Sequence, residues 1–328
     1  NNNLSTNGHA IYAGGSTGQG NHYLDNDVSA AGNFAVILAN DNLFKLERND
    51  FTGSHRGIQL SSMDGVALAN VDLSTIQDLS LQLVSVQNST VSDIVARGPS
   101  AGVRLDSSSG NHILRGDASG TGGNGFYLLN SSGNTIEAST ANGRNIGVIL
   151  QGTSGGNLVR NNNLSTNGHA IYAGGSTGQG NHYLDNDLSG AANYAVILAN
   201  DNFFKLERND FTGSVHGIQL SSMDGVALED VDLSTVQGFS LRLVSVQNST
   251  ISDIVAGGPS AGVRLDSSGG NHISRVDASG SGGNGFYLIN SSGNTIATST
   301  ASSRHTGVLL RGASGGNLVK NSNLSGNA

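Results

Sequence analysis

The chain repeats itself at a period of 160 residues, and this repeat limits the possible folds more than any other feature. Residues 1–27 return letter for letter as 161–187, and a gap-free overlay of 1–160 on 161–320 shows 30 differences. Residues 321–328 begin a third copy. Self-similarity at a fixed period is typical of solenoids and repeat arrays. We therefore expect one continuous solenoid made of two units, 1–160 and 161–320, followed by the start of a third.

A shorter period lies inside each unit, and its marker is a small residue followed by an apolar, a variable and an apolar residue. In the first unit the markers begin, at spacings of 22 to 25 residues, at Ala10, Ala35, Gly57, Ser80, Gly102, Gly125 and Gly147. This alternation is that of a β-strand with one buried face. Two further apolar stations follow each marker, separated by the turn formers Gly, Asn, Ser and Asp. The sequence predicts about 14 coils of about 23 residues, each with three short strands, and no helix.

The pattern G-h-x-L-x-x-S-x-G-N-x-I, seen in GVRLDSSSGNHI and GFYLLNSSGNTI, resembles that of right-handed parallel β-helix repeat proteins. These include the pectin-lyase-like superfamily and the NosD-like and alginate-epimerase-like repeats. The resemblance covers essentially the whole chain and implies an all-β fold, a right-handed parallel β-helix solenoid. It implies no single function, because the superfamily contains lyases, hydrolases, epimerases, adhesins and inert stalks.

Asparagine recurs at one phase of consecutive coils and predicts an amide ladder. Stacked amides hydrogen-bond to their neighbours above and below, which satisfies polar groups at a buried turn. Phe44 and Val66 hold this position in the second and third coils, where apolar stacking is expected instead. The predicted ladder consists of Asn111, Asn134, Asn157, Asn181, Asn271, Asn294 and Asn317.

Aspartate recurs at the third station of several coils. Asp27, Asp50 and Asp72 would lie about 4.8 Å apart in stacked coils. Such carboxylates can bind Ca²⁺, which favours oxygen ligands, or each can cap its own turn by accepting backbone N–H groups. We favour turn capping and predict no cofactor, with Ca²⁺ as the alternative. The same station holds Asp117, Asp187, Asp210, Asp232 and Asp277.

One polar cluster has the composition of an acid–base site. It surrounds His22 and contains Asp25, Asp27, Glu47, Arg48 and Asp50 in adjacent coils. Polysaccharide lyases and epimerases of this fold need a base and often a cation. The Asp-Pro-His signature of alginate epimerases is missing, however, and the cluster would recur around His182. We interpret it as surface decoration and predict no catalytic residue; the Gly-rich segment Gly14–Gly20 is interpreted as an elongated turn.

The variable residue of each marker points outward, and apolar residues recur at this position. A contiguous exposed apolar stripe usually marks an interaction surface. Its 160-residue recurrence suits a partner with the same period, such as a second copy of the chain. Sugars stacked on the tyrosines, or a terminal segment or loop that covers the face, are the alternatives. The stripe consists of Tyr12, Ile37, Tyr127, Ile149, Tyr172, Ile197, Tyr287 and Leu309.

Composition narrows the partners and the location. The net charge is −8 and no basic run or RNA-binding motif is present, which argues against nucleic acid. No stretch approaches the ~18 apolar residues of a membrane span. The absence of Cys, with abundant Asn, Gly, Ser and Thr, fits an extracellular or cell-surface protein of a prokaryote.

We therefore expect a structural extracellular repeat protein, a segment of a surface fibre, stalk, sheath or large adhesin that associates with itself head-to-tail and laterally. Neither end carries the atypical polar coil that caps isolated solenoids. The pattern is thus expected to continue in a longer protein or by head-to-tail stacking. The alternative is a polysaccharide-active enzyme of lyase or epimerase type, or a carbohydrate-binding module, of the pectin-lyase-like class. An enzyme normally keeps one cleft, whereas the polar clusters here occur twice.

Overall fold

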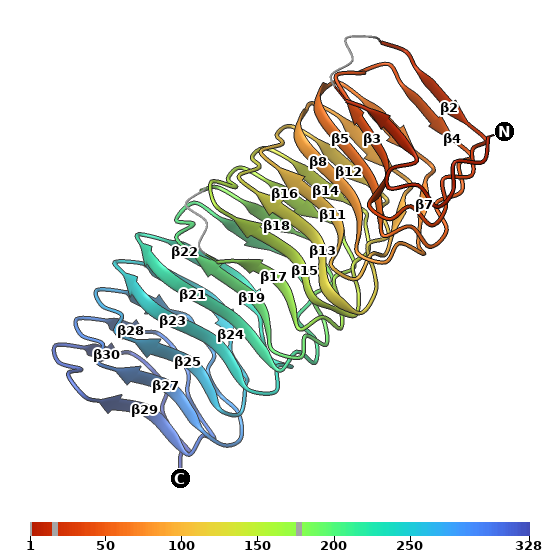
Figure 1. The fold of residues 1–328 in the computed structure, drawn as a ribbon. Helices are drawn as coiled ribbons and strands as arrows, with labels where there is room; N and C mark the ends of the chain where they lie inside the picture. Colours follow the sequence, from red (N-terminus) through yellow and green to blue (C-terminus); the bar gives the residue numbers. More distant parts are fainter. Residues whose placement is uncertain (1, 15–18, 175–178) are drawn as a thin grey trace. The chain divides into compact units, whose positions relative to one another are not determined.

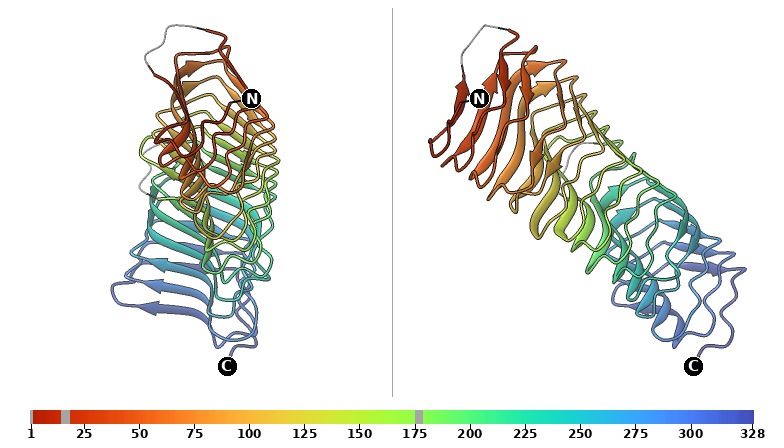
Figure 2. Two further views of the ribbon diagram at one scale, coloured as in Figure 1. Left: turned by 45° about the vertical axis from the view of Figure 1, so that its right-hand side comes forward. Right: turned by 90° about the vertical axis from the view of Figure 1, so that its right-hand side faces the viewer.

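The computed structural model describes residues 2–14, 19–174 and 179–328, and this part of the chain forms 30 short β-strands and no helix. The strands belong to two compact units, Asn1–Leu164 and Ser165–Ala328. Within each unit, parallel strands stack coil upon coil (Figures 1 and 2). Each unit is a β-solenoid whose turns are spaced about 23 residues apart. The prediction of an all-β parallel β-helix is confirmed, whereas one continuous helix through both units stays a prediction.

The markers form the first sheet of each unit, and their register is the one expected from the sequence. Tyr12 pairs with Ile37, Ile37 with Gln59, and Gln59 with Gln82. In the first unit these strands are β1 (Ile11–Ala13), β3 (Phe34–Ala39), β5 (Arg56–Asp64), β8 (Leu79–Gln87), β11 (Ala101–Asp106), β13 (Gly122–Leu129) and β15 (Arg144–Gln151). In the second unit they are β17 (His169–Ala173), β19 (Tyr194–Ala199), β21 (His216–Asp224), β23 (Phe239–Gln247), β25 (Ala261–Asp266), β27 (Asn284–Ile289) and β29 (Thr306–Arg311).

The second sheet is interrupted at the same place in both units. In the first unit β2 (His22–Leu24) pairs with β4 (Lys45–Glu47), and a separate run contains β6 (Ala67–Ala69), β9 (Thr90–Ser92), β12 (His112–Leu114), β14 (Thr135–Glu137) and β16 (Leu158–Arg160). In the second unit β18 (His182–Leu184) pairs with β20 (Lys205–Glu207), and the other run contains β22 (Ala227–Asp232), β24 (Thr250–Val255), β26 (His272–Ser274), β28 (Thr295–Ala297) and β30 (Leu318–Lys320).

On the third side of the coils fewer residues pair as strands. Among the described residues of the first unit, the strands on this side are β7 (Asp72–Leu73) and β10 (Val95–Ala96). Elsewhere single bridges stack one coil on the next, such as Asp27 on Asp50 and Asp117 on Thr140. This side thus holds the third station of each coil, where the aspartates recur.

The core of each unit lies between the sheets and consists of inward-facing aliphatic side chains. Val36, Ile58 and Leu81 are fully buried at equivalent places in successive coils. Complete burial of such a side chain stabilises a fold by about 1.5–3 kcal/mol. The small residue of the marker has a steric cause, since a Cβ on Gly57 would lie 2.2 Å from the carbonyl oxygen of Ser80. Coil stacking therefore fixes both the apolar pattern and the small residue before it.

Candidate functional site

The predicted asparagine ladder is present within each unit. The Asn111 amide donates to Asn134 Oδ1 at 3.0 Å, and the Asn134 amide donates to Asn157 Oδ1 at 3.2 Å. Each Oδ1 also accepts the backbone N–H of the ladder residue in the preceding coil, as Asn134 Oδ1 does from Asn111 at 2.9 Å. In the second unit the same bonds join Asn271, Asn294 and Asn317. The ladder thus ties each coil to the next through a side-chain acceptor.

Asn181 differs from the other ladder members, because its amide donates to a carboxylate. Asn181 Nδ2 lies 2.8 Å from Asp201 Oδ2, and in the first unit Asn21 Nδ2 lies 2.6 Å from Asp41 Oδ2. Asp41 also accepts the backbone N–H groups of Gly20 and Asn21. Burial opposes ionisation of Asp41, but these hydrogen bonds outweigh it and lower the pKa of the carboxyl. Sequence reasoning missed both aspartates, because their phase lies outside the repeated stations.

The aspartates of the third station cap their own turns. Asp27 Oδ1 accepts the backbone N–H of Ser29 at 3.1 Å, and Asp50 Oδ1 accepts that of Thr52 at 2.9 Å. The same bond, from the residue two positions later, is made by Asp72, Asp117, Asp187, Asp210, Asp232 and Asp277. Within the described residues no group of three or more His, Cys, Asp or Glu is arranged to hold a metal ion. The geometry therefore supports turn capping over Ca²⁺ binding.

The structure brings most of the cluster predicted around His22 together, since Asp25, Asp27, Arg48 and Asp50 line one hollow of about 350 Å³. Arg48 Nε and Nη2 donate to the two oxygens of Asp25 at 2.7 and 2.8 Å, and Nη1 lies 3.2 Å from Glu47. The Arg48 guanidinium lowers the pKa of the Asp25 carboxyl. Among the described residues, the His22 side chain makes no hydrogen bond or ion pair. Asp27 and Asp50 line the hollow and also cap their own turns.

The same ion-pair geometry recurs in the second unit. Arg208 Nε and Nη2 lie 2.6 and 2.7 Å from the two oxygens of Asp185, and Nη1 lies 3.1 Å from Glu207. Both arginines occupy left-handed corners, with φ of 53° at Arg48 and 52° at Arg208. These pairs are exposed and contribute little stability. They hold neighbouring corners together.

The outward stripe is less exposed than the sequence predicts. Tyr12 is 67% exposed, but Ile149 is only 6% exposed, so Ile149 does not belong to an exposed surface. Tyr127 is half-buried, because the Arg104 guanidinium lies 4.9 Å from its ring centre and its hydroxyl donates to Gln151 Oε1 at 2.6 Å. The remaining members are also half-buried: Ile37, Tyr172, Ile197, Tyr287 and Leu309. Polar neighbours therefore break the stripe into patches, and its role in association stays a prediction.

One buried arginine in each unit escaped sequence reasoning. Arg144 is 2% exposed and donates to the carbonyl oxygens of Ala118, Gly98 and Ser119 at 2.8, 2.8 and 3.1 Å. Burial lowers the pKa of its guanidinium. Arg304 makes the same contacts in the second unit, with Ala278, Gly258 and Ser279. Since Gly98 and Arg144 are 46 residues apart, one side chain joins three coils.

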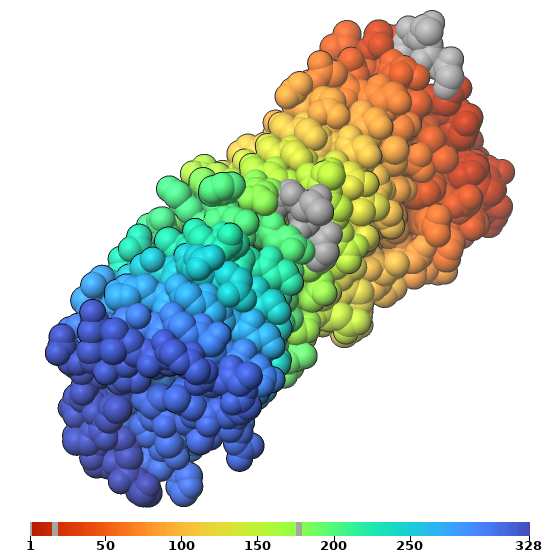
Figure 3. All heavy atoms as spheres, turned by 90° about the vertical axis from the view of Figure 1, so that its left-hand side faces the viewer, coloured from red at the N-terminus to blue at the C-terminus, as the bar shows by residue number. Residues whose placement is uncertain are grey.

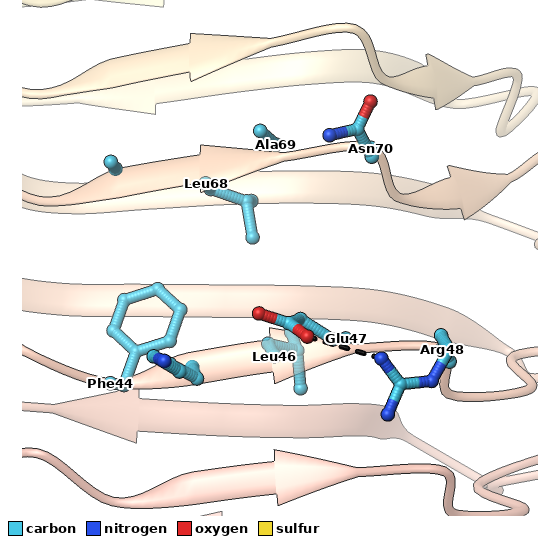
Figure 4. Close-up of a pocket in the computed structure, with 9 residues that line it drawn as sticks. Phe44, Leu46, Glu47, Arg48, Leu68, Ala69 and Asn70 are labelled. Carbon is cyan, nitrogen blue, oxygen red and sulfur yellow. Dashed lines mark hydrogen bonds and ion pairs between the residues drawn. The ribbon is translucent and has the colours of Figure 1, made fainter.

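The interruption of the second sheet leaves a hollow in each unit, which we call the slot. In the first unit it has a volume of about 370 Å³ and separates β4 from β6 (Figure 4). Its lining consists of Phe44, Lys45, Leu46, Glu47, Arg48, Ala67, Leu68, Ala69 and Asn70. The slot of the second unit has about 290 Å³ and is lined by Phe204, Lys205, Leu206, Glu207, Ala227, Leu228 and Glu229. On the first sheet the same two coils stay paired, for example at Val36 and Ile58.

The slot coincides with an apolar residue at the ladder position. At the other coil boundaries of the first unit a side-chain oxygen accepts the backbone N–H of the preceding coil: Asp41 for Asn21, Ser89 for Val66, and Asn111 for Ser89. At the boundary between β4 and β6 that acceptor would belong to Val66, which has none. The second unit repeats the situation at Val226. The sequence showed the apolar exception, but it did not show that the strands would part there.

Comparisons with known proteins agree with this fold. A family model described as "Periplasmic copper-binding protein (NosD)" matches residues 80–235 and 176–328. No curated protein sequence matches the chain. Within the described residues, no helix has the length and apolarity needed to cross a membrane.

Similar solved structures have diverse activities. Tailspike protein 3 of bacteriophage CBA120 is 15% identical with a TM-score of 0.58; the similarity covers 92% of this chain and 51% of the tailspike, so this chain spans about half its length. The A-module of the Azotobacter vinelandii mannuronan C-5 epimerase AlgE4 is 11% identical with a TM-score of 0.48, covering 82% and 91%. The Streptococcus pneumoniae surface adhesin PfbA is 9% identical with a TM-score of 0.34, covering 84% and 85%. At 15% identity the similarity to the tailspike shows the fold alone.

Proposed function

The chain belongs to the family described as periplasmic copper-binding protein (NosD), and on this basis we propose that it is a structural repeat protein of the cell exterior or periplasm. In this proposal it is a segment of a surface fibre, stalk, sheath or large adhesin. Each 160-residue unit is a spacer, and copies associate through their coil ends and sides.

One observation carries this proposal: in both units, these polar side chains make hydrogen bonds or ion pairs within the fold. The ladder asparagines hold neighbouring coils, the third-station aspartates hold their turns, and the arginines beside β4 and β20 hold corner carboxylates. Each arrangement occurs in both units with similar distances. A catalytic group needs a free proton acceptor or donor within reach of a substrate. These side chains instead hold coils, turns and corners in place, as a spacer requires.

The copper in the family's description does not fit the residues of this chain. Copper favours Cys and Met sulfur and clustered imidazoles. The chain has no Cys, and its two methionines, Met63 and Met223, are each only 2% exposed within separate units. The described residues also contain no cluster of three metal-ligating His, Cys, Asp or Glu side chains. We derive no function from copper.

In the proposal, head-to-tail association pairs the edges formed by β29 and β30 with another copy of the chain. In the last coil (dark blue in Figure 3) Leu310 is 48% exposed and Val319 is 39% exposed, whereas the equivalent Leu150 and Val159 are fully buried. An unpaired strand edge with exposed apolar residues is a template for another chain.

Charge substitution at this edge tests the proposal. We expect the protein to associate reversibly in sedimentation equilibrium, and the variant Leu310→Glu with Val319→Glu to remain monomeric, because buried carboxylates without partners are strongly disfavoured. Ala69→Glu is the matched control, since the second unit already carries Glu229 at this position and the residue is exposed. A wild-type protein that stays monomeric at all concentrations contradicts head-to-tail association.

The alternative is a polysaccharide-active enzyme of lyase or epimerase type, or a carbohydrate-binding module. A panel of uronate polysaccharides, assayed for unsaturated products and for epimerised residues, separates the enzyme from a spacer. Turnover that is lost in Arg48→Gln would replace the spacer proposal by an enzyme that uses this corner.

A further inference from the structure

The slot exposes two unpaired strand edges that face each other. Parallel strands alternate the direction of their backbone groups. The N–H of Lys45 donates to Asn21 in the preceding coil at 2.8 Å, so that of Leu46 points towards β6. The N–H of Asn70 donates to Ser92 in the following coil at 3.2 Å, so that of Ala69 points towards β4. Among the described residues, no backbone hydrogen bond joins β4 to β6.

We propose that each slot accepts a short extended segment of another protein chain, which adds a parallel strand between β4 and β6, or between β20 and β22. A peptide strand matches both edges, because its N–H and C=O groups repeat at the same spacing as theirs. Addition of a strand to an exposed edge is a common mode of peptide recognition. Here the added strand pairs with two edges at once.

The geometry of the coil permits this insertion. An inserted strand requires about 9.6 Å between its two neighbours, twice the usual strand spacing. The coils are joined on the first sheet by β3 and β5, from Phe34 with Arg56 to Ala39 with Ser61. Opening of the second sheet to this width about the first sheet breaks no hydrogen bond between β4 and β6, but it requires the bond from the Asp64 N–H to Asn42 Oδ1 beside the slot to yield.

The side chains beside the slot define the partner's chemistry. Leu46 and Leu68 point into the core and are 5% and 2% exposed, so the middle residue of the inserted strand must be apolar. Lys45 and Glu47 point outward from β4, as their exposure shows. A parallel strand places its first residue beside Lys45 and its third beside Glu47. The preferred segment is therefore acidic, apolar, basic.

The second slot strengthens the same preference. Lys205 and Glu207 repeat the charges of β4, and Glu229 replaces Ala69 on the opposite edge. The third residue of an inserted strand would then lie between two carboxylates, which favours a basic side chain. The two slots thus select the same order of charges, and the second selects it more strongly.

Hydrogen exchange measured by NMR tests the proposal on the intact chain. In the free protein we expect the amides of Leu46 and Ala69 to exchange quickly, while those of Lys45 and Thr90 are protected because they donate to Asn21 and Val66. Addition of the peptide GNEIKAS, with blocked ends, to about 1 mM should protect the first pair. Two peptides should bind per chain. Protection of these amides without peptide, or no change with peptide, overturns the proposal.

A charge-reversed peptide separates strand insertion from weak surface binding. The peptide GNKIEAS has the opposite order of charges and should bind about fivefold more weakly, since two exposed charge pairs reverse sign. Equal binding of the two peptides contradicts the predicted direction and register.

Two slot variants distinguish loss of binding from loss of folding. Val66→Asn with Val226→Asn supplies the missing ladder acceptor, so both slots should close, the amides should become protected and peptide binding should fall at least tenfold. Ala67→Pro removes an N–H that faces the slot and should abolish binding at the first slot alone, which leaves one peptide per chain. Unchanged binding in a folded Ala67→Pro protein overturns insertion between β4 and β6.

Discussion

The two units build the same patch of their first sheets from different side chains. In the first unit Arg56 Nε donates to Asp78 Oδ2 at 2.7 Å, and its guanidinium lies 5.4 Å from the centre of the Phe34 ring. In the second unit three rings replace this ion pair: His216 lies 4.7 Å from Tyr194 and 5.3 Å from Phe239. The backbone register is unchanged, because Phe34 pairs with Arg56 as Tyr194 pairs with His216.

These substitutions form a matched set. A Cβ on Gly238 would lie 2.3 Å from His216 Nδ1, so the ring arrangement excludes the aspartate that the first unit uses at this position. The backbone N–H of Phe239 donates to the same nitrogen at 3.0 Å. The exchanges between the units are Phe34 for Tyr194, His55 for Val215, Arg56 for His216, Asp78 for Gly238, Leu79 for Phe239 and Gln82 for Arg242. This outward patch thus differs between the units as a set, while the ladder asparagines and the third-station aspartates are kept.

The largest expected effect on stability comes from removal of the buried arginine that both units share. Arg144→Met leaves three buried carbonyl oxygens without a donor and should lower the free energy of unfolding by about 3–5 kcal/mol. Arg304→Met should cost the second unit a similar amount. Urea unfolding followed by circular dichroism measures both. A loss in only one unit would show that the two scaffolds are not equivalent.

Introduction of the first unit's aspartate at position 238 should lower the free energy of unfolding by less than the loss of Arg144. The other first-unit residues of the patch should restore it. Gly238→Asp forces a side chain against His216 and should lower the free energy of unfolding by about 1–3 kcal/mol. Transfer of the complete first-unit set to positions 194, 215, 216, 238, 239 and 242 should restore most of the loss, since neighbouring substitutions are not additive. If the complete set is as unstable as the single variant, the patches are not exchangeable.

The ring patch should also make the second unit sensitive to pH. Burial, and then Arg242, lower the pKa of the His216 imidazole below its ordinary value of 6.5. A base with a lowered pKa in the folded state stabilises the fold fully above the unfolded pKa, and this contribution is lost as the pH falls below about 6.5. Amide exchange in β21 should therefore quicken between pH 7 and pH 5.5, after correction for intrinsic rates. His216→Arg, the first-unit residue, should not show this dependence.

The smallest effect is expected at the first unit's ion pair. Asp78→Asn should cost only about 0.5 kcal/mol, because the Arg56 side chain is 40% exposed. Burial raises the pKa of Asp78, but the Arg56 hydrogen bond helps to lower it below its ordinary value. The difference in the free energy of unfolding between the variant and the wild type should therefore vanish in acid. Thermal unfolding at low and high salt measures it. A loss of several kcal/mol would mean that the ion pair, and not the coil stacking, holds this patch.

Sequence periodicity predicted the features that repeat in every coil. The strands, their register, the asparagine ladder and the turn aspartates follow from stacking equivalent residues, and stacking acts on every coil alike. Arg144 could not be predicted in this way, because its inward turn depends on the positions of the carbonyls at Gly98 and Ala118. Ile149 shares the outward phase of Tyr12, yet its burial depends on what surrounds it and not on its phase.

The sequence indicated the position of the slot but not the separation of the strands. Val66 stood out as an exception to the ladder, and apolar stacking was the expected replacement. In the structure β4 and β6 are unpaired beside this valine, which has no acceptor to offer. The segment Gly14–Gly20, interpreted as an elongated turn, lies mostly outside the described residues. Predictions from period alone therefore hold for the scaffold and weaken where one coil departs from its neighbours.

Electron microscopy of the purified protein tests the central claim, a repeating spacer that elongates through its coil ends, most directly. The account predicts filaments with an axial repeat of about 34 Å, which is seven coils at the usual strand spacing. The variant Leu310→Glu with Val319→Glu should abolish them. Isolated wild-type particles at concentrations where the account predicts filaments would contradict it.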